Sequence, residues 1–343
     1  MPRFISCPLP IRSTDERQLR FRIGSLYFFR ESRTSRTPPV IPLKIKTSVG
    51  RPGRWLRLIP RRVDFGGQYY ITRNRKRMTS YRPWGSLEDG TIEFESLTTE
   101  TLEGALTVIR EAFFTDENVS VAVDLTSERG ASDELEELCL DAARDGVSVV
   151  AIDVTTGEVV GASFNKIQIR PELPTTGSFQ RFSERCKCKS SKALVDYMID
   201  VDSRVDMFEH FNVDCILEMM FLATKRSHRK RRIGELLVAA SVEIGRQLNR
   251  GKNVKTPVEV DGVTCLANAD AVPSLISMLA TSNYTKKIGD RTGFETLAEV
   301  SFDEFSFAGK KFSERIGDTH RFSWLVAKRL SDPRTRTISG SLI

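Results

Sequence analysis

The sequence predicts an α/β domain in which helices flank a mixed sheet, and three observations predict it. From about residue 91, strand-like runs of β-branched residues alternate with segments whose apolar residues recur at helical spacing. Two strand-like runs, 147–154 and 159–169, are separated only by a short polar turn, which indicates a hairpin. A continuous apolar run at 214–224 leads through a basic turn into an amphipathic segment at 233–248.

The first predicted elements precede the hairpin. Residues 91–97 alternate apolar and polar side chains, which predicts a half-buried strand. Thr98 or Thr99 can then cap a helix. Its apolar residues recur at helical spacing as Leu102, Leu106, Ile109 and Phe113. A second helix is expected from Ser132 to a stop at Gly146.

After the hairpin, proline, glycine and polar residues predict an exposed loop over 170–191. An amphipathic helix is expected from Leu194 to Phe208. The apolar run 214–224 predicts a central strand covered on both faces, and the helix over 233–248 follows the basic turn. Further along, the expected elements are a strand at 272–280, a helix from Asn283 to about Asp290 with a stop at Gly293, strands at 294–305 and 321–330, and a competing strand at 258–266.

Residues 1–77 differ in composition from the rest. The chain carries a formal charge of +7, but this segment alone holds 19 Lys and Arg against four Asp and Glu, so the remainder is acidic. Prolines interrupt it, and we expect a disordered tail over 1–80, a folded domain over 84–332 and a short C-terminal tail over 333–343. The basic tail suits a mitochondrial transit peptide, a nucleic-acid or anionic-surface contact, or an inert extension.

Composition also excludes several classes of protein. No stretch reaches the roughly 18 consecutive apolar residues of a membrane helix, so a cytoplasmic protein is expected, or a mitochondrial one if the tail is a transit peptide. The six cysteines follow no secreted-framework spacing, which indicates a reducing compartment. The three histidines are scattered along the chain, so no metal site is expected.

The turn between the strand 214–224 and the following helix is the candidate site. The first N–H groups of a helix have no intrahelical acceptor, and the helix dipole lies behind them, so they form an anion cradle. Six of the eight residues 225–232 are Lys or Arg, and Gly234 lets a ligand approach the backbone. A basic run can equally be a solvated face or a nucleic-acid patch; its place at the end of a buried strand favours the cradle.

These residues resemble a known family. Leu222-Ala223-Thr224 followed by 229–234, Arg-Lys-Arg-Arg-Ile-Gly, is similar to the acetyl-CoA motif Arg/Gln-x-x-Gly-x-Gly/Ala of the GCN5-related N-acetyltransferase (GNAT) superfamily. Three further stretches resemble the invertebrate arylalkylamine (dopamine-type) branch. They are Phe113-Phe114-Thr115-Asp116-Glu117-Asn118, Asp206-Met207-Phe208-Glu209-His210-Phe211 and residues 280–288, Ala-Thr-Ser-Asn-Tyr-Thr-Lys-Lys-Ile. The first motif glycine is Arg232 here, whose side chain can crowd a diphosphate or turn away and pair with it.

The resemblance implies a GNAT-type fold, a central mixed, mostly antiparallel splayed sheet flanked by helices, over about 88–330. It also implies transfer of acetyl from acetyl-CoA, as co-substrate and without a metal, to a primary amine. The residues expected to bind acetyl-CoA are Leu222, Ala223, Thr224, Arg229, Lys230, Arg231, Arg232, Ile233, Gly234 and Glu235. A helical insertion near 191–211 is expected to cover the acceptor side.

The chemistry assigns the remaining roles. An alkylamine with a pKa near 10 is neutral in only about one molecule per thousand at pH 7, so a base is required; Glu117, carried over from the family, is that candidate. A backbone N–H within 222–224 would stabilise the oxyanion. The resemblance also implies that Thr281, Ser282, Tyr284 and Thr285, at the start of a helix, lie beside the departing thiolate, although a helix cap or a core position is the alternative. Candidate acceptor walls are Phe113, Phe114, Tyr197, Phe208 and Phe211.

The predicted activity is acetyl-CoA-dependent N-acetylation of a small arylalkylamine. The alternatives are an acetyltransferase for polyamine or protein lysine amines, and a non-catalytic module that binds acyl-CoA or nucleic acid. The expected partners are the small amine and acetyl-CoA, with no membrane, and with nucleic acid only through the basic tail.

Overall fold

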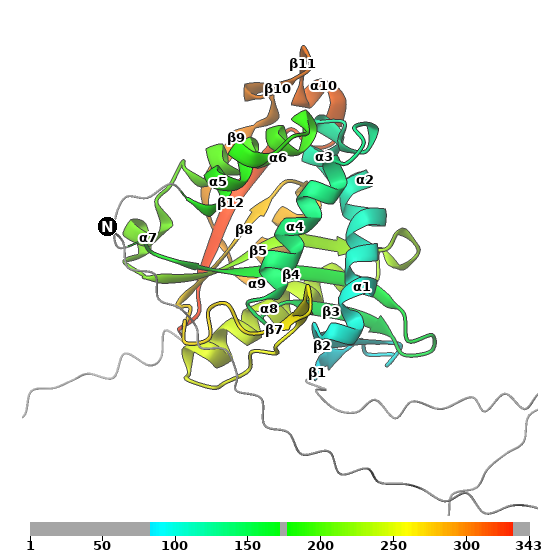
Figure 1. The fold of residues 1–343 in the computed structure, drawn as a ribbon, viewed down its shortest axis with the longest axis vertical. Helices are drawn as coiled ribbons and strands as arrows, with labels where there is room; N and C mark the ends of the chain where they lie inside the picture. Colours follow the sequence, from blue (N-terminus) through cyan, green and yellow to red (C-terminus); the bar gives the residue numbers. More distant parts are fainter. Residues whose placement is uncertain (1–82, 172–176, 332–343) are drawn as a thin grey trace, which may run out of the picture. The chain divides into compact units, whose positions relative to one another are not determined.

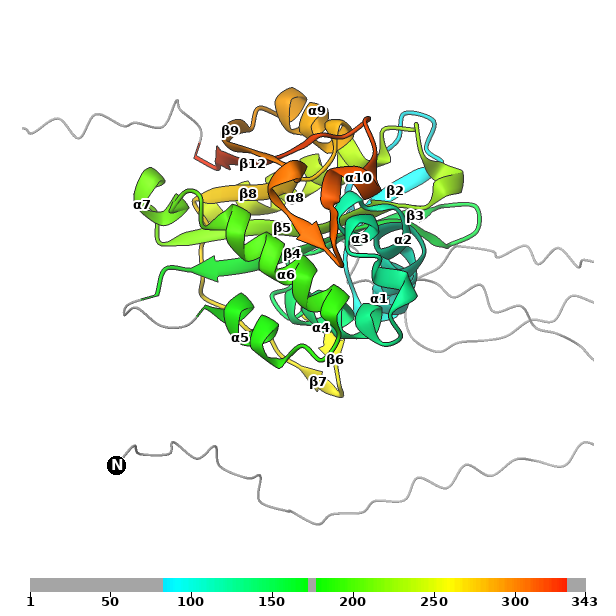
Figure 2. The same cartoon turned by 90° about the horizontal axis from the view of Figure 1, so that it is seen from above.

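The computed structural model describes residues 83–171 and 177–331, which form layers of helices around one sheet (Figures 1 and 2). Within these residues, eight strands make the sheet in the order β1-β2-β3-β4-β5-β8-β12-β9. Every neighbouring pair is antiparallel except β5 and β8, which run parallel. The mixed, mostly antiparallel sheet is confirmed. The strands are Pro83–Ser86 (β1), Ile92–Ser96 (β2), Val149–Asp153 (β3), Val159–Ile169 (β4), Cys215–Thr224 (β5), Leu275–Ala280 (β8), Glu295–Ser301 (β9) and Phe322–Arg329 (β12).

Helices cover both faces of the sheet (Figure 2). One face carries α1 (Thr99–Val108), α4 (Ala131–Ala143) and α6 (Lys189–Asp202), and the other carries α8 (Ile233–Asn249) and α9 (Asn283–Thr292). Each face has its own apolar core, because the strands are buried on both sides. Shorter elements connect these layers. They are α2 (Phe114–Asp116), α3 (Asn118–Ala122), α5 (Ser178–Arg185), α7 (Met207–Phe211), α10 (Phe312–Ile316) and the small strands β6 (Glu259–Val260), β7 (Val263–Thr264), β10 (Ser306–Phe307) and β11 (Lys310–Lys311).

The sheet opens between β5 and β8. The two strands pair only from Ile216 to Met219 on β5, whereas β5 continues to Thr224 without that partner. Its register with β4 shifts beside Met220, which is the extra residue of a bulge. The bulge also reverses the alternation of side chains, so Met219 joins the core under α8 whereas Phe221 joins the core under α6. The expected splay is therefore present, at the end of β5 that leads into α8.

Most predicted elements are confirmed, and the differences have local causes. Thr98 caps α1, but the helix passes through a π-helical turn, Ile109–Phe113, before α2 and α3. The expected loop over 170–191 is wrong, because it contains α5 and the first turn of α6. The helix expected to reach Phe208 ends at Asp202, and α7 follows after a break. The competing strand at 258–266 consists of β6 and β7, outside the main sheet.

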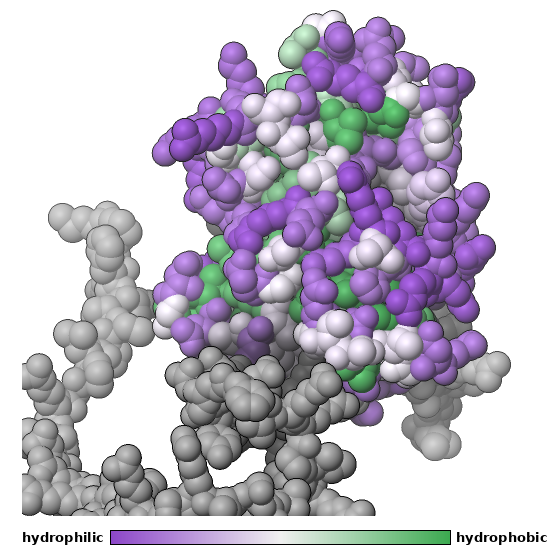
Figure 3. Space-filling view, turned by 90° about the vertical axis from the view of Figure 1, so that its right-hand side faces the viewer, coloured by the Kyte–Doolittle hydropathy of each residue, from purple (hydrophilic) through white to green (hydrophobic). Residues whose placement is uncertain are grey.

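The sequence also missed β1 at one edge of the sheet, and it missed α10 with β10 and β11 between the last two strands. The predicted tails at 1–80 and 333–343 lie entirely outside the described residues and stay predictions. No helix among the described residues is long and apolar enough to cross a membrane. The face of the domain in Figure 3 is largely hydrophilic, with apolar residues in small separate patches.

Candidate active site

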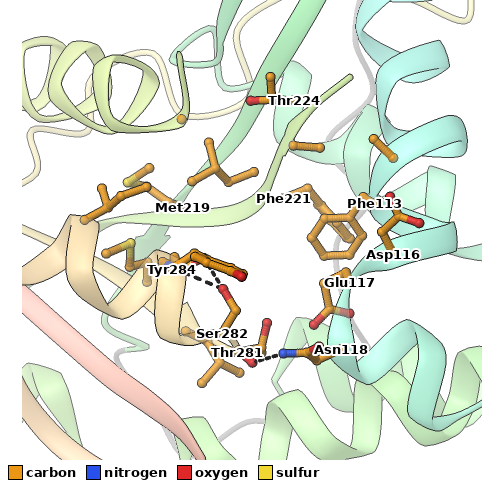
Figure 4. A pocket seen from close by; sticks show the side chains of 18 of the residues that line it. Phe113, Asp116, Glu117, Asn118, Met219, Phe221, Thr224, Thr281, Ser282 and Tyr284 are labelled. Carbon is orange, nitrogen blue, oxygen red and sulfur yellow. Dashed lines mark hydrogen bonds between the residues drawn. The ribbon is translucent and has the colours of Figure 1, made fainter. Parts of the chain in front are cut away.

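A cavity of about 790 Å³ occupies the opening between β5 and β8. Its walls come from the end of β5, the basic turn, the starts of α8 and α9, the segment around α2 and α3, and α6. Figure 4 shows Glu117 and Asn118 on one side of this space and Thr281 and Ser282 on the other. The cavity brings together nearly all of the predicted site residues: Glu117, Leu222, Ala223, Thr224, Arg229, Lys230, Arg232, Ile233, Gly234, Glu235, Thr281, Ser282, Tyr284 and Thr285.

Arg231 is the exception, because it does not line this cavity. Its guanidinium donates to the Thr91 hydroxyl and lies 3.6 Å from the Asp89 carboxylate. Both partners belong to the turn between β1 and β2, on the side away from the cavity. Lys230 and Arg232 flank it with positive φ angles of 64° and 62°. This alternation of backbone conformation turns successive side chains in different directions.

The backbone of the basic turn forms the expected cradle. Within the described part of the chain, the N–H groups of residues 230–235 have no hydrogen-bond acceptor. Arg232 is the N-cap of α8 and has left-handed backbone geometry, and its carbonyl accepts the Leu236 N–H at 3.1 Å. That geometry explains why a glycine suits this motif position, since a left-handed residue with a Cβ is strained. The free N–H groups and the helix dipole together favour an anion here.

The Arg232 side chain turns along the first turn of α8. Its guanidinium pairs with the Glu235 carboxylate at 2.6 Å, and Arg291 of α9 approaches the same carboxylate at 3.6 Å. The hydrogen bond from Arg232 lowers the pKa of Glu235. The arginine therefore pairs within the protein, and it leaves the N–H groups uncovered.

Asp116 joins the basic turn to the opposite wall. Its carboxylate accepts hydrogen bonds from Arg226 and from Arg229, the latter at 2.6 Å. Chiefly through the Arg226 hydrogen bond, these contacts lower the pKa of Asp116 to about 2. Arg229 also donates to the Thr224 carbonyl at 3.3 Å. The conformation of the cradle is thus coupled to the residue next to Glu117.

Other side chains of the basic run also lie beside carboxylates. Lys225 contacts the carboxylates of Glu158 and, at 3.6 Å, Glu111. His228 lies 3.5 Å from Asp153. Of the six Lys and Arg in 225–232, only Lys230 has no carboxylate partner among the described residues. Most of the charge of this run is therefore balanced locally.

Glu117 caps the short helix α3. Its two carboxylate oxygens accept from the Val119 N–H at 2.9 Å and from the Ser120 N–H and hydroxyl at 2.8 and 3.0 Å. A carboxylate offers about four lone-pair sites, so one acceptor site is left. Next to it, Asn118 donates to the Thr281 carbonyl at 2.6 Å and fixes this wall against the end of β8 (Figure 4).

The start of α9 forms the facing wall. Ser282 is its N-cap and accepts from the Thr285 N–H at 3.1 Å, with the Thr285 hydroxyl 3.0 Å away. Tyr284 is 66% exposed and packs edge-on against His320, with ring centroids 5.3 Å apart. The helix-cap alternative is confirmed for Ser282, which also lines the cavity, whereas Tyr284 is not a core residue.

The acceptor side is apolar. Phe113 lines it and packs on Phe221 at 5.1 Å between centroids, and Tyr197 lines it from α6. The Tyr197 hydroxyl hydrogen-bonds the Ser323 hydroxyl at 2.5 Å. The other three predicted wall residues are not part of this cavity, because Phe114 is buried in the core, and Phe208 and Phe211 pack on another apolar cluster.

Several lining residues were missed by the sequence analysis. Met220 and Phe221 were assigned only to a buried strand, since nothing in periodicity reveals the bulge. His320 lies far along the chain without a motif. The remaining missed residues are Ala112, Asp116, Asn118, Val119, Leu194, Met198, Met219, His228, Met278, Leu279, Lys287, Ile288 and Arg291. No group of three or more His, Cys, Asp or Glu side chains among the described residues could hold a metal ion.

Solved structures with a similar fold include insect N-acetyltransferases. Arylalkylamine N-acetyltransferase 2 of Aedes aegypti matches at 20% identity and a TM-score of 0.56, over 70% of this chain and 99% of that one. Putative arylalkylamine N-acetyltransferase 7 of the same mosquito matches at 15% identity and a TM-score of 0.55, over 75% of this chain and 98% of that one. The Drosophila melanogaster polyamine N-acetyltransferase matches at 16% identity and a TM-score of 0.53, over 69% of this chain and 99% of that one.

The chain therefore has the fold of the GNAT superfamily. Within that class, its structure resembles the insect arylalkylamine branch, as the sequence motifs predicted. No protein-family model matches the sequence, and no curated protein sequence matches it either.

Proposed function

We propose that this protein is an acetyl-CoA-dependent N-acetyltransferase that acts on a small primary amine. The observation that carries the proposal is the row of unpaired N–H groups at 230–235, which opens onto a cavity that reaches Glu117. Such N–H groups suit the diphosphate of a coenzyme A. Gly234 supports this role, because a Cβ there would lie 3.6 Å from Ile288, inside the lining of the cavity.

Glu117 is the proposed base. Its remaining acceptor site can take a proton from the ammonium form of the amine, directly or through one water. The three hydrogen bonds from Val119 and Ser120 hold the carboxylate in place during this transfer. The neutral amine then attacks the thioester carbonyl.

The end of β5 is the proposed oxyanion donor. Beyond Met219 this strand has no β8 partner, so a backbone N–H within 222–224 is available to the developing negative charge. The departing thiolate would lie near α9. Tyr284, with its exposed hydroxyl, is the candidate donor of a proton to it, and Ser282, Thr281 and Thr285 are the neighbouring hydroxyls.

An arylalkylamine is the proposed acceptor. Phe113, Phe221 and Tyr197 give the acceptor side aromatic walls, and apolar pockets with few polar groups suit such ligands. The neighbours named above include arylalkylamine and polyamine enzymes, which is consistent with an amine acceptor. A nucleic-acid-binding module is less well supported, because five of the six Lys and Arg in the described run 225–232 already pair with carboxylates.

The test is direct. The full chain is assayed for acetyl-CoA consumption with phenethylamine, tyramine, serotonin, a polyamine and a lysine peptide. Acetyl-CoA binding is measured by calorimetry, and RNA retention is measured at low and high salt. We expect saturable acetyl-CoA binding and turnover with an arylalkylamine. Salt-sensitive RNA binding without an acetyl-CoA signal would reject the proposal, because phosphate contacts weaken as salt rises.

A further inference from the structure

A second polar group lies on the sheet face under α6. Glu218 on β5 and Ser277 on β8 are 9% and 1% exposed, and they are register partners in the short parallel stretch. Their side chains therefore project from the same face of the sheet. Asp202, the last residue of α6, is electrostatically close to Glu218: burial, and then the Glu218 carboxylate, raise the pKa of Asp202.

These groups are incompletely satisfied. Gln168 of β4 donates to Glu218 at 2.8 Å, and Lys166 is the nearby cation. The buried Ser277 hydroxyl has no hydrogen-bond partner in the described part of the chain. Buried polar groups are nearly always paired, so the unpaired Ser277 hydroxyl indicates a partner that the described residues do not supply.

The three polar residues do not line the cavity themselves, but each lies close along its element to a residue that does. Three residues that line the cavity share an element with the three polar residues. Each lies on the same face as its polar neighbour, one turn away on the helix or two positions away on a strand. Methionine side chains are flexible and can move aside for a ligand. The pairs are Met198 and Asp202 on α6, Met220 and Glu218 on β5, and Leu279 and Ser277 on β8.

We propose that Asp202, Glu218 and Ser277 bind a second ammonium group, at the far end of an elongated acceptor amine. The inference rests on the proposed acetyltransferase function and adds long diamines to the arylalkylamines proposed as its acceptors. An ammonium has three donors and no acceptor, which matches two carboxylates and one hydroxyl. Burial raises the pKa of both carboxylates, and an ammonium group placed between them would offset the cost of keeping them ionised.

The spacing sets the length of the substrate. Four strand positions separate Glu218 from Leu222, where the reacting carbonyl is proposed to lie, and at roughly 3.3 Å per residue this is about 13 Å. An extended diamine with about eight carbons between its two nitrogens spans nearly this distance, and the protein side chains at both ends cover the rest. A diaminobutane is too short to occupy both sites.

The experiment compares diaminooctane with octylamine, and diaminobutane with butylamine, at saturating acetyl-CoA. The full chain is tested beside Glu218→Gln, Asp202→Asn and the control Asp196→Asn, which changes an exposed carboxylate on the same helix. We expect diaminooctane to have a KM roughly tenfold or more below that of octylamine, since one charge-assisted hydrogen bond suffices for that factor. Both site variants should remove this advantage and leave octylamine unchanged, and the control should keep it.

Two results would overturn the inference. One is an equal KM for the long diamine and monoamine in the wild type. The other is a rise in KM that the site variants show equally for the diamine and the monoamine, which would indicate a structural role. Melting temperatures of the variants verify that they fold. A tyramine preference over phenethylamine that Glu218→Gln abolishes, without a diamine advantage, would assign the site to a hydroxyl and also overturn it. If no amine is acetylated, the proposed function fails, and calorimetric binding of diaminooctane to wild type and Glu218→Gln still decides the site.

Discussion

The two walls of the cavity are built in different ways. The wall proposed for acetyl-CoA comes mainly from one continuous segment, the end of β5, the basic turn and the first turn of α8. The acceptor wall combines α6, the turn around Glu117 and the start of α9. One of the hydrogen bonds that hold it, from Asn118 to Thr281, joins residues 163 positions apart.

This difference separates what neighbouring residues specify from what packing between distant segments specifies. A strand, a turn and a helix in direct succession fix the positions of their N–H groups through local geometry. The acceptor wall depends on packing between segments that are distant in the sequence. Substitutions should therefore act on one wall at a time, except where a contact joins them.

The largest effect is expected from Glu117→Gln, which changes only the acceptor wall. Loss of a general base lowers kcat by roughly a hundredfold to ten-thousandfold, whereas acetyl-CoA binding should stay within about twofold because the cradle is untouched. Steady-state kinetics and calorimetry measure the two quantities. Glutamine keeps one acceptor oxygen for the α3 cap, and unchanged turnover in a folded variant would remove Glu117 from the mechanism.

Gly234→Ala is the corresponding change in the cradle. The added methyl group would meet Ile288 at an ordinary contact distance of 3.6 Å, so the fold accepts it, and helix stability should rise by about 0.5–1 kcal/mol. The methyl occupies space beside the proposed diphosphate, so we expect the acetyl-CoA Kd to rise about tenfold. Gly245→Ala is the matched control, since its methyl would lie 2.9 Å from Leu330 and should destabilise the fold. A Kd unchanged by Gly234→Ala would contradict the cradle.

Asp116→Asn tests the contact that joins the walls. The folded-state pKa of Asp116 is about 2, against an ordinary value of 3.8. Its carboxylate therefore stabilises the fold above about pH 4, and this contribution is lost as the pH falls through 2. Because its arginine partners are largely exposed, we expect a loss of about 1 kcal/mol at pH 6. Urea unfolding at pH 6 and pH 3 should show a gap between wild type and variant that narrows at pH 3; a constant gap would argue against the ion pairs.

The smallest effect is expected from Arg232→Gly, which tests whether the left-handed backbone at position 232 is strained. Glycine adopts the left-handed conformation at φ 62° without strain, so unfolding free energy should rise by about 0.5–1 kcal/mol. Arg232→Ala, which keeps a Cβ, should show no such gain. Thermal unfolding of both variants checks this, and equal behaviour would mean that the left-handed backbone is not the source of the strain.

The sequence by itself determined much of the fold. The hairpin of β3 and β4, the central strand β5 and the long helix α8 follow from periodicity and turn residues, which act over a few positions. Local signals failed where tertiary contacts overrode them. Proline and polar residues predicted a loop where α5 packs against α6, and a single helix was expected where the chain breaks between α6 and α7.

The candidate site divides in the same way. The motif at 229–234 located the cradle, because the free N–H groups of a helix start follow from local connectivity alone. Only the tertiary structure showed that Arg231 turns away, that a bulge at Met220 reverses which residues face α6, and that Glu218 and Ser277 are paired in register on neighbouring strands. These features depend on register and packing between distant segments, and no local pattern of residue types specifies them.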